Sequence, residues 1–307
     1  MSSQKPTTPS GVPLTAAEQN LIVPKGRSLW ADAIKRLKRD RAAMVCLGII
    51  AFYALLAIAA RVGLLASPWD QVVGGAYDPP SSGSIPQMLG TDIFGRSVLY
   101  KVIHGTRIAM SVGLVATMIS IPIGVFMGAV AGYFGGWVDE LVVWFYTTLS
   151  AIPGIMLLIA ITFVLGKGLT SIYIALGVTS WIGLARVIRG EFIKHKSRDY
   201  VVAANSLGAS HFSRIFRHIL PNVSHFIIIS LSVEFMGAIK AEVILSFLGL
   251  GVQGQPSWGV MIDDAKLELA RGVWWQLAGA TTAMFFVVLA FNILGDSLRD
   301  ALDPKIK

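Results

Sequence analysis

Charged residues and cysteine are scarce in this chain. Of its 307 residues only 14% are Asp, Glu, Lys or Arg, whereas 54% are hydrophobic. A soluble globular domain carries roughly 25% charged residues, so the composition argues against an ordinary water-exposed surface. The single cysteine, Cys46, excludes an internal disulfide and gives no sign of an oxidising compartment.

Motifs for nucleotide binding and catalysis are missing as well. Lys167 has neither the earlier glycine nor the following Ser or Thr of a phosphate-binding loop, so we do not expect this chain to hold ATP by itself. The segment 249–254 matches G-x-G-x-x-G by letter, but it follows a hydrophobic helix and not a strand. Neither a buried Ser–His pair nor two intramembrane aspartates are evident. We therefore predict no catalytic residues.

A metal site is not expected either. His211, His218 and His225 recur at regular spacing, which could suggest a row of metal ligands. Pro221 interrupts the helix between the last two, and no carboxylate or thiol completes the set. We expect neither a metal nor a cofactor in this chain.

Long uncharged runs dominate the rest of the sequence. Each is about as long as the ~18–20 residues that a helix needs to cross a bilayer. Barrel strands would alternate polar and apolar residues, and these runs do not. We predict an all-α integral membrane protein. The runs are Ala42–Ala60, Ile108–Trp137, Leu141–Gly166, Gly168–Ala185 and Gly272–Gly295.

Six membrane-spanning helices are predicted. The first begins too late and is too long for a cleaved signal peptide, and a further helix begins at Pro221, a favourable residue for a first turn. The helices are expected near residues 42–62, 108–133, 141–165, 168–187, 221–248 and 275–294.

Basic residues predict the orientation of the chain. They concentrate before Ala42, between Arg186 and Pro221, and after Asp296. Because Lys and Arg accumulate on the cytoplasmic side, we expect the tail 1–41, the loop 188–220 and the C-terminus 297–307 to be cytoplasmic, and the loop 63–106 to be external. The net charge of +8 then sets topology and contacts membrane lipid, and does not indicate nucleic acid.

The N-terminal tail has two parts. Residues 1–24 are rich in Ser, Thr, Pro and Gly and are expected to be disordered. Residues 28–41 alternate apolar and basic positions at helical spacing, which predicts either an amphipathic helix in the membrane interface or an ordinary positively flanked start of the first span.

Two of the predicted spans carry unusual residues. Gly124, Gly128 and Gly132 form a row of small residues that allows another helix to approach closely. Pro153 and Gly154 lie inside the third span and should kink or open it.

The loop 188–220 contains a well-formed elbow. It is expected to hold a short helix, a turn at Gly208, where φ > 0 is needed, and a second amphipathic helix that Ser210 caps and that stops before Pro221. The elbow is either a rigid docking element or a helix pair that rests on the bilayer. An apolar stripe follows the second helix: Phe212, Ile215, Phe216 and Ile219.

This elbow resembles the cytoplasmic loop motif of bacterial ABC-importer permeases, E-A-A-x3-G-x9-I-x-L-P. The matching positions are Ala203, Ala204, Gly208, Leu220 and Pro221. Val202 replaces the usual glutamate, which leaves that contact without its residue. His218 replaces the isoleucine, as is common in the peptide-transporter branch.

Three further stretches resemble the C-type permease subunit of dipeptide and oligopeptide importers. The external one contains Gly90, Thr91, Asp92, Gly95 and Arg96. The others are residues 245–251 with 256–259, and residues 289–304. Together the matches extend from Leu89 to the end of the chain.

The resemblance implies a fold, a site and partners. It implies a type I ABC-importer permease domain over 107–296 in the bacterial cytoplasmic (inner) membrane, with a second permease subunit, two ATPase subunits that bind ATP and Mg²⁺, and an external substrate-binding protein. The elbow would dock on an ATPase. The residues expected to act there are Tyr200, Ala203, Ala204, Gly208 and Ser210, with His218, Leu220 and Pro221 anchoring the return to the fifth helix.

Three ionisable residues lie in the fifth helix. Glu234, Lys240 and Glu242 are separated by mostly apolar residues, and charges at membrane depth usually face a partner or water. Glu242 coincides with a glutamate common in the family, whereas Lys240 is not expected there. We hypothesise that Glu242 or Lys240 meets a charge on the partner permease; otherwise both lie near the outer interface and extend toward water.

The predicted function is therefore import of di- or oligopeptides by a permease that is not itself an enzyme. The first alternative keeps the architecture and changes the cargo to nickel, glutathione or another small solute. A second alternative is a membrane receptor or scaffold that signals through the elbow. Peptide length and the residues that contact cargo are not specified by these motifs.

Overall fold

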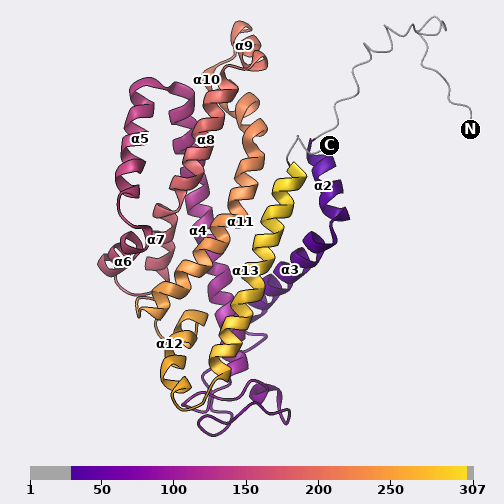
Figure 1. Cartoon of the computed structure of the whole chain (residues 1–307), viewed down its shortest axis with the longest axis vertical. Coiled ribbons are helices and arrows are strands. Elements are labelled where there is room, and N and C mark those ends of the chain that lie inside the picture. Colours follow the sequence, from indigo (N-terminus) through magenta and orange to yellow (C-terminus); the bar gives the residue numbers. More distant parts are fainter. Residues whose placement is uncertain (1–28, 303–307) are drawn as a thin grey trace, which may run out of the picture.

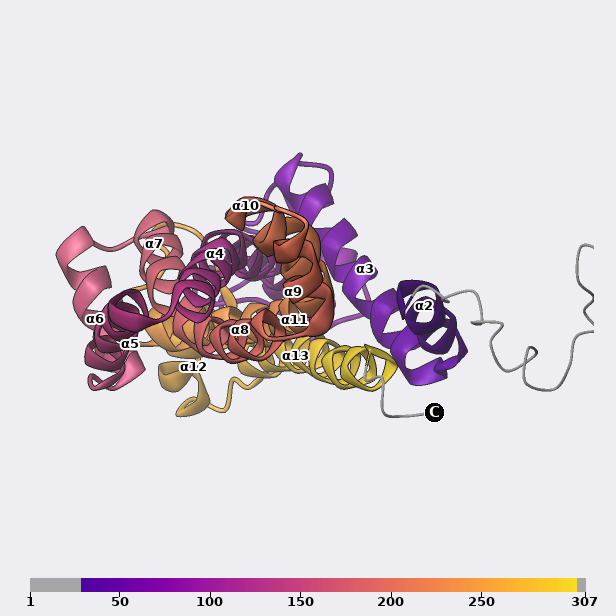
Figure 2. The ribbon, with the colours of Figure 1, turned by 90° about the horizontal axis from the view of Figure 1, so that it is seen from above.

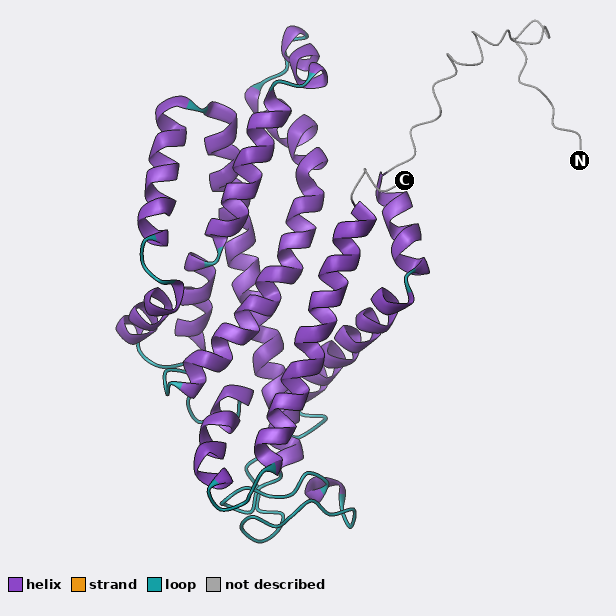
Figure 3. Cartoon of the chain, viewed as in Figure 1, coloured by secondary structure: helices purple, strands orange, loops and turns teal. Residues whose placement is uncertain are grey.

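The computed structural model describes residues 29–302, so the predicted disordered segment 1–24 lies outside the described residues. The described chain folds into helices joined by loops (Figure 3). The helices are α2 (Leu29–Arg39), α3 (Arg41–Arg61), η1 (Ile85–Gln87), α4 (Val98–Phe134), α5 (Gly136–Ser150), α6 (Gly154–Leu165), α7 (Leu169–Thr179), α8 (Trp181–Lys196), α9 (Asp199–Ser206), α10 (His211–Ser213), η2 (Arg214–Ile219), α11 (Leu220–Phe247), α12 (Trp258–Leu269) and α13 (Trp275–Leu302).

The prediction of an all-α membrane protein agrees with these helices, but six spans are not confirmed. By length and composition four helical segments could cross a membrane: α3, α4, α7 with α8, and α13. A fifth span results if α5 and α6 are counted as one broken crossing. The long helix α11 (Leu220–Phe247), predicted as a span, is not among them.

Some helices are longer than predicted, and one predicted helix is broken in two. The second helix begins ten residues before the predicted 108, because Ser97 caps it by accepting a hydrogen bond from the Tyr100 N–H. The third predicted helix is two helices, which bend by 86° across the break at Pro153. A kink or opening was expected there, and the break is of that kind. The helix expected over 168–187 continues to Lys196 as α8.

Helix α4 lies in the middle of the bundle. Figure 2 shows α5, α6 and α7 on one side of it and α2 and α3 on the other. Glycine allows its closest contact, with α8: a Cβ on Gly128 would lie 2.5 Å from the Ala185 carbonyl oxygen, and one on Gly132 would lie 2.5 Å from that of Arg189. The glycine row therefore packs helices, as predicted.

The N-terminal helix α2 is separate from α3. Asp40 ends α2 and caps α3, accepting hydrogen bonds from the N–H groups of Ala42 and Ala43. Its other carboxylate oxygen accepts the Ser297 hydroxyl at 2.7 Å, which fastens the junction to α13. The amphipathic segment predicted over 28–41 is thus a distinct helix packed against α13, and not only the start of the first span.

The bundle has two opposite ends (Figure 1). Helices α9 and α10 project from one end, and α12 lies at the other with the long loop that precedes α4. A cluster of buried side chains that includes Tyr53, Phe235 and Trp258 joins α3, α11, α12 and α13. The packing around α9 and the elbow belongs to a separate cluster, which includes Phe192, Val201 and Ile219.

Candidate functional site

The elbow at the α9–α10 end is closed by local hydrogen bonds. Gly208 has φ +79°, and its N–H donates to the Asn205 carbonyl at 2.9 Å. The Ala209 N–H donates to the Ala204 carbonyl at 3.0 Å. This pair of bonds is the Schellman motif that ends many helices at glycine. Ser210 caps α10 by accepting the Ser213 N–H at 3.2 Å. The predicted turn and cap are both confirmed.

The second helix of the elbow does not stop before Pro221. It runs from α10 through the π-helical η2 directly into α11. A proline lacks an N–H and crowds the carbonyl one turn earlier, and a wider π-helical turn relieves such a conflict. Pro221 stands in the first turn of α11. The carbonyl oxygen of His218 accepts the side-chain amide of Asn222 at 2.6 Å, and Leu220 packs against the buried cluster beneath the elbow.

The apolar stripe predicted for the second helix divides between two sides. Ile215 and Ile219 turn inward and pack with Phe192 and Val223. Phe212 and Phe216 are exposed, and their ring centroids lie 4.4 Å apart. Side chains four positions apart lie on one face of a helix, which keeps Phe212 beside Phe216 and Ile215 beside Ile219. The exposed pair, not the whole stripe, is available to a partner.

The outward surface of the elbow differs in part from the predicted one. Tyr200 and Ala203 are exposed, as a docking role requires. Ala204 is buried at 8% exposure and packs inside the elbow, so its small size serves the turn and not a partner. Leu207, 89% exposed, was not predicted. It immediately precedes the turn glycine, and an apolar residue at that exposed position was the signal that could have identified it.

The elbow is fastened to the end of α4. The Tyr133 hydroxyl lies 3.0 Å from His211 Nδ1. Arg214 joins the two arms of the elbow, because it donates to the Asn205 side chain at 2.7 Å and lies 3.1 Å from the same His211 nitrogen. His195 on α8 lies 2.6 Å from the Tyr200 hydroxyl. A displacement of the elbow would therefore be transmitted to α4 and α8.

At the other end of α4, the motif that was predicted to be external forms a compact cluster of hydrogen bonds and ion pairs around Asp92. Asp92 Oδ1 accepts the Arg96 N–H at 2.9 Å, and Asp92 Oδ2 lies 2.9 Å from Arg96 Nε and 3.2 Å from Lys101 Nζ. Burial alone would raise the pKa of Asp92, but the charge of Lys101, the hydrogen bond from Arg96 and the charge of Arg96 together hold that pKa below its ordinary value. Gln276 Oε1 accepts a second hydrogen bond from Lys101 Nζ at 2.6 Å.

The other motif residues hold this Asp92 cluster against α13. The indole N–H of Trp275 donates to the Thr91 carbonyl at 2.9 Å. Gly90 has φ +73°, and a Cβ there would lie 2.9 Å from that indole ring; a Cβ on Gly95, at φ +72°, would lie 2.3 Å from the Gly74 carbonyl oxygen. The motif therefore positions the loop that precedes α4. Lys101, Trp275 and Gln276 were not predicted, since they lie outside the motif in sequence.

The three charges of α11 have different surroundings. Glu242 is fully buried inside this chain, and its Oε1 accepts the Ser246 hydroxyl at 2.7 Å. Glu234 is half-buried and accepts a hydrogen bond from Ser120 of α4. Lys240 is exposed, and no ion pair of its ammonium occurs within residues 29–302. Glu242 and Lys240 were the two candidates for pairing with a charge on a partner subunit. Because Glu242 is buried within this chain, only Lys240 is accessible for such a pair.

Two of the three histidines considered as metal ligands contact aromatic residues. His211 contacts Tyr133, as described above, and the His225 ring lies against Phe226 with centroids 4.1 Å apart. Across residues 29–302 the structure places no group of three or more His, Cys, Asp or Glu side chains where they could hold a metal ion.

Comparison with known proteins assigns the chain to a family. Residues 120–307 match the family model described as binding-protein-dependent transport system inner membrane component. The chain belongs to this family. Residues 28–80 match a second model, the N-terminal transmembrane domain of oligopeptide transport permease C, which covers α2, α3 and the beginning of the loop before α4.

Several relatives are similar over nearly their whole length. The dipeptide transport system permease protein DppC of Bacillus subtilis is 38% identical over 91% of this chain and 87% of the relative. The oligopeptide transport system permease protein OppC of the same organism is 35% identical over 95% of each chain. The glutathione transport system permease protein GsiD of Pectobacterium atrosepticum is 35% identical over 92% and 93%.

A solved structure shares the fold. A chain of the methionine ABC transporter MetNI, in an inward-facing conformation, superposes with a TM-score of 0.52 and 16% identity. The match covers 67% of this chain and 96% of that one. The membrane domain of this chain therefore has the fold of an ABC-importer permease, as the motif resemblance implied.

Proposed function

We propose that this chain is a permease subunit of an ATP-driven importer for di- and oligopeptides in the bacterial inner membrane. It pairs with a second, non-identical permease, two ATPase subunits that bind ATP and Mg²⁺, and an external substrate-binding protein. The observation that best supports the proposal is the exposed apolar surface of the elbow. The names of the relatives support the cargo, since two are named for peptides and one for glutathione, itself a tripeptide; they do not favour nickel.

The elbow has the properties of a docking element that transmits movement. Leu207, Phe212 and Phe216 expose apolar surface on a loop rich in basic residues, and an apolar patch of this kind marks an interaction site. The Schellman turn and the contact of Tyr133 with His211 leave the elbow little freedom of its own. ATP-driven closure of the ATPase pair would therefore move α4 and α8 as rigid bodies.

The topology we propose has six crossings with both termini in the cytoplasm. Helix α11 supplies the sixth: its 28 residues exceed the ~20 needed to span a bilayer. Its charged side chains are accommodated because Glu242 is buried within the chain and Glu234 bonds to Ser120. Lys240 is the remaining charge, and we propose that it meets a carboxylate of the second permease.

The test is to purify the tagged chain in mild detergent and identify the proteins that accompany it. Proline fixes φ near −65°, so Gly208→Pro cannot adopt the turn, and we expect loss of the ATPases with the second permease retained. Phe212→Asp keeps the turn and removes one exposed ring, and we expect the same result. The matched control is Leu267→Asp, which changes a similarly exposed residue on α12 at the opposite end.

The outcomes separate the candidate functions. Recovery of a second permease and ATPases with the unchanged chain, and loss of the ATPases only in the elbow variants, supports the importer. A chain that purifies alone favours the receptor or scaffold. ATPases that persist in both elbow variants would place the docking surface elsewhere.

A further inference from the structure

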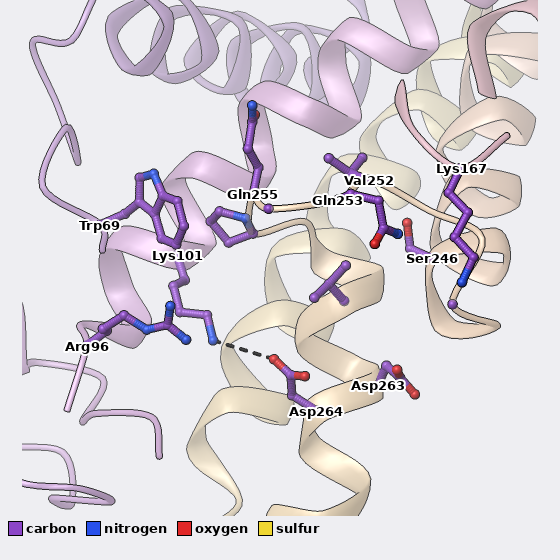
Figure 4. Close-up of a pocket in the computed structure, with 14 residues that line it drawn as sticks. Trp69, Arg96, Lys101, Lys167, Ser246, Val252, Gln253, Gln255, Asp263 and Asp264 are labelled. Atoms are coloured by element: carbon purple, nitrogen blue, oxygen red, sulfur yellow. Dashed lines mark ion pairs between the residues drawn. The ribbon is translucent and has the colours of Figure 1, made fainter. Parts of the chain in front are cut away.

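A polar cavity of about 550 Å³ lies at the outer end of the molecule (Figure 4). Its walls come from the loop before α4, the link between α6 and α7, the segment after α11, and α12. Its volume is in the range of small-molecule sites, roughly 300–1,000 Å³. Charges of both signs line it: Arg96, Lys101, Lys167, Asp263 and Asp264.

Two of these charges are already engaged within the chain. Lys101 is almost fully buried, and its ammonium contacts Asp92 at 3.2 Å and Gln276 at 2.6 Å. Asp263 lies 2.5 Å from Lys266, its neighbour one turn along α12. Both are held by local partners, so they shape the cavity and leave little capacity for a ligand.

Two cations on the cavity wall retain free donors. Lys167 is exposed between Gly166 and Gly168, and its ammonium has no hydrogen bond or ion pair with any part of the chain from residue 29 to residue 302. Arg96 uses Nε for its ion pair with Asp92. Its two terminal nitrogens, over the Phe94 ring at 4.5 Å from guanidinium carbon to centroid, can still donate. The two cations lie at opposite ends of the cavity (Figure 4), and Lys167, whose ammonium is unpaired within residues 29–302, can receive a carboxylate.

One carboxylate on the wall has only a long ion pair within the described part of the chain. Asp264 has a half-exposed side chain, and its nearest cation, Lys101, is 3.8 Å away and satisfied by other partners. The indole of Trp69 lies beside Arg96, and Gln255 also lines the cavity (Figure 4). An amide side chain can pair with a peptide group, and an indole offers a flat apolar surface.

We propose that this cavity binds a short peptide in its zwitterionic form, with Lys167 holding the carboxylate and Asp264 holding the α-ammonium. The proposal rests on the proposed function and adds a site for its substrate on this chain. A simple anion would meet the two aspartates, and a simple cation would meet Lys167 and Arg96. A dipolar ligand satisfies both sets, and it exchanges part of its hydration for fixed charges before it enters the membrane.

The test compares peptides that carry or lack each terminal charge. The complete importer, reconstituted in proteoliposomes, receives from its binding protein either a dipeptide or the same dipeptide with an amidated C-terminus. The preference of the binding protein is identical for every permease variant, so it cancels when acid-to-amide uptake ratios are compared between variants. Lys167→Gln should lower this ratio roughly tenfold, since a charge-assisted hydrogen bond is lost, and Lys167→Arg should preserve it.

The ammonium end and a matched control complete the design. Asp264→Asn should lower the uptake of the free-amine dipeptide relative to the N-acetylated one. Arg271→Gln removes a cation from the same face, near Tyr77 and outside the cavity, and should leave both ratios unchanged. A ratio that stays constant in Lys167→Gln and Asp264→Asn, or that shifts equally in Arg271→Gln, would overturn the proposal.

A second measurement does not depend on delivery. A dipeptide with a photoreactive side chain, added to the complex without binding protein, should label residues 249–256, and the free dipeptide should compete better than one blocked at both ends. Absence of labelling there, or equal labelling of the double variant Lys167→Gln/Asp264→Asn, would contradict the site. If the unmodified importer takes up no peptide at all, the proposed function itself fails.

Discussion

Replacing Lys101 by methionine tests the buried ion pair between Lys101 and Asp92 in the Asp92 cluster. The side chains of Lys101 and Asp92 are 4% and 1% exposed. Methionine has a similar length without the charge, so Lys101→Met leaves the Asp92 carboxylate and the Gln276 oxygen in place without their common donor. The remaining cation, Arg96, is partly solvated and contacts only one carboxylate oxygen through its side chain.

The expected loss of stability is large. Removing one partner of a buried ion pair costs about 3–5 kcal/mol, because an uncompensated charge stays buried. With roughly 2–4 °C per kcal/mol for a large domain, the melting temperature should fall on the order of 10 °C. The double variant Lys101→Met/Asp92→Asn removes both charges, and it should recover at least half of that loss.

The measurement is the thermal stability of the detergent-solubilised complex, read by size-exclusion chromatography after heating. Lys194→Met is the control, because Lys194 is 56% exposed and its pair with Glu191 should contribute less than about 1 kcal/mol. A melting temperature within 2–3 °C of the unchanged protein for Lys101→Met, by the same scale, would refute the argument. So would a double variant that is less stable than the single one.

Three further predictions concern other parts of the molecule. Gly128→Ala should destabilise the protein by about 1–3 kcal/mol, because the added Cβ would lie 2.5 Å from the Ala185 carbonyl oxygen. Gly190 has open space around it, so the control Gly190→Ala should not destabilise the protein in the same heating assay. Burial, partly opposed by Lys101, raises the pKa of Glu268 from 4.5 to about 7. The folded state then keeps a proton that the unfolded state loses, so stability should fall as pH rises from 4.5 to 7; Glu268→Gln should abolish this fall and add on the order of 2–3 kcal/mol at pH 8, and a pH profile parallel to that of the unchanged protein would contradict it. Lys240→Met should reduce recovery of the second permease with the tagged chain, and unchanged recovery and transport would exclude a partner carboxylate.

Local features of the site were predictable because they depend on neighbours in the sequence. Gly208 and Ser210 were expected to turn and cap the elbow, and both do so through bonds that span five residues or fewer. The break at Pro153 was likewise expected, since proline removes a donor wherever it stands in a helix. The glycine row of α4 was expected to pack against another helix, although its neighbour α8 could not be named from the spacing.

The return from the elbow into α11 was predicted less well. Pro221 was expected to stop a helix, but a proline in the first turn is compatible with helix, and the π-helical η2 before it makes the passage continuous. Ala204 matched the motif of the family and was assigned to the docking surface. Its burial depends on how the two arms of the elbow pack together, which the motif does not state.

The sequence by itself determined the class of this protein: its uncharged runs require helices in a membrane, and its motifs indicate an importer permease. Only the tertiary structure decided which charges are partnered. Lys101 and Gln276 are 175 residues apart and meet at 2.6 Å, and Glu242 and Lys240 lie two positions apart but are respectively buried and exposed. Hydropathy is a property of each segment, whereas the partner of a charge depends on which segments the fold brings side by side.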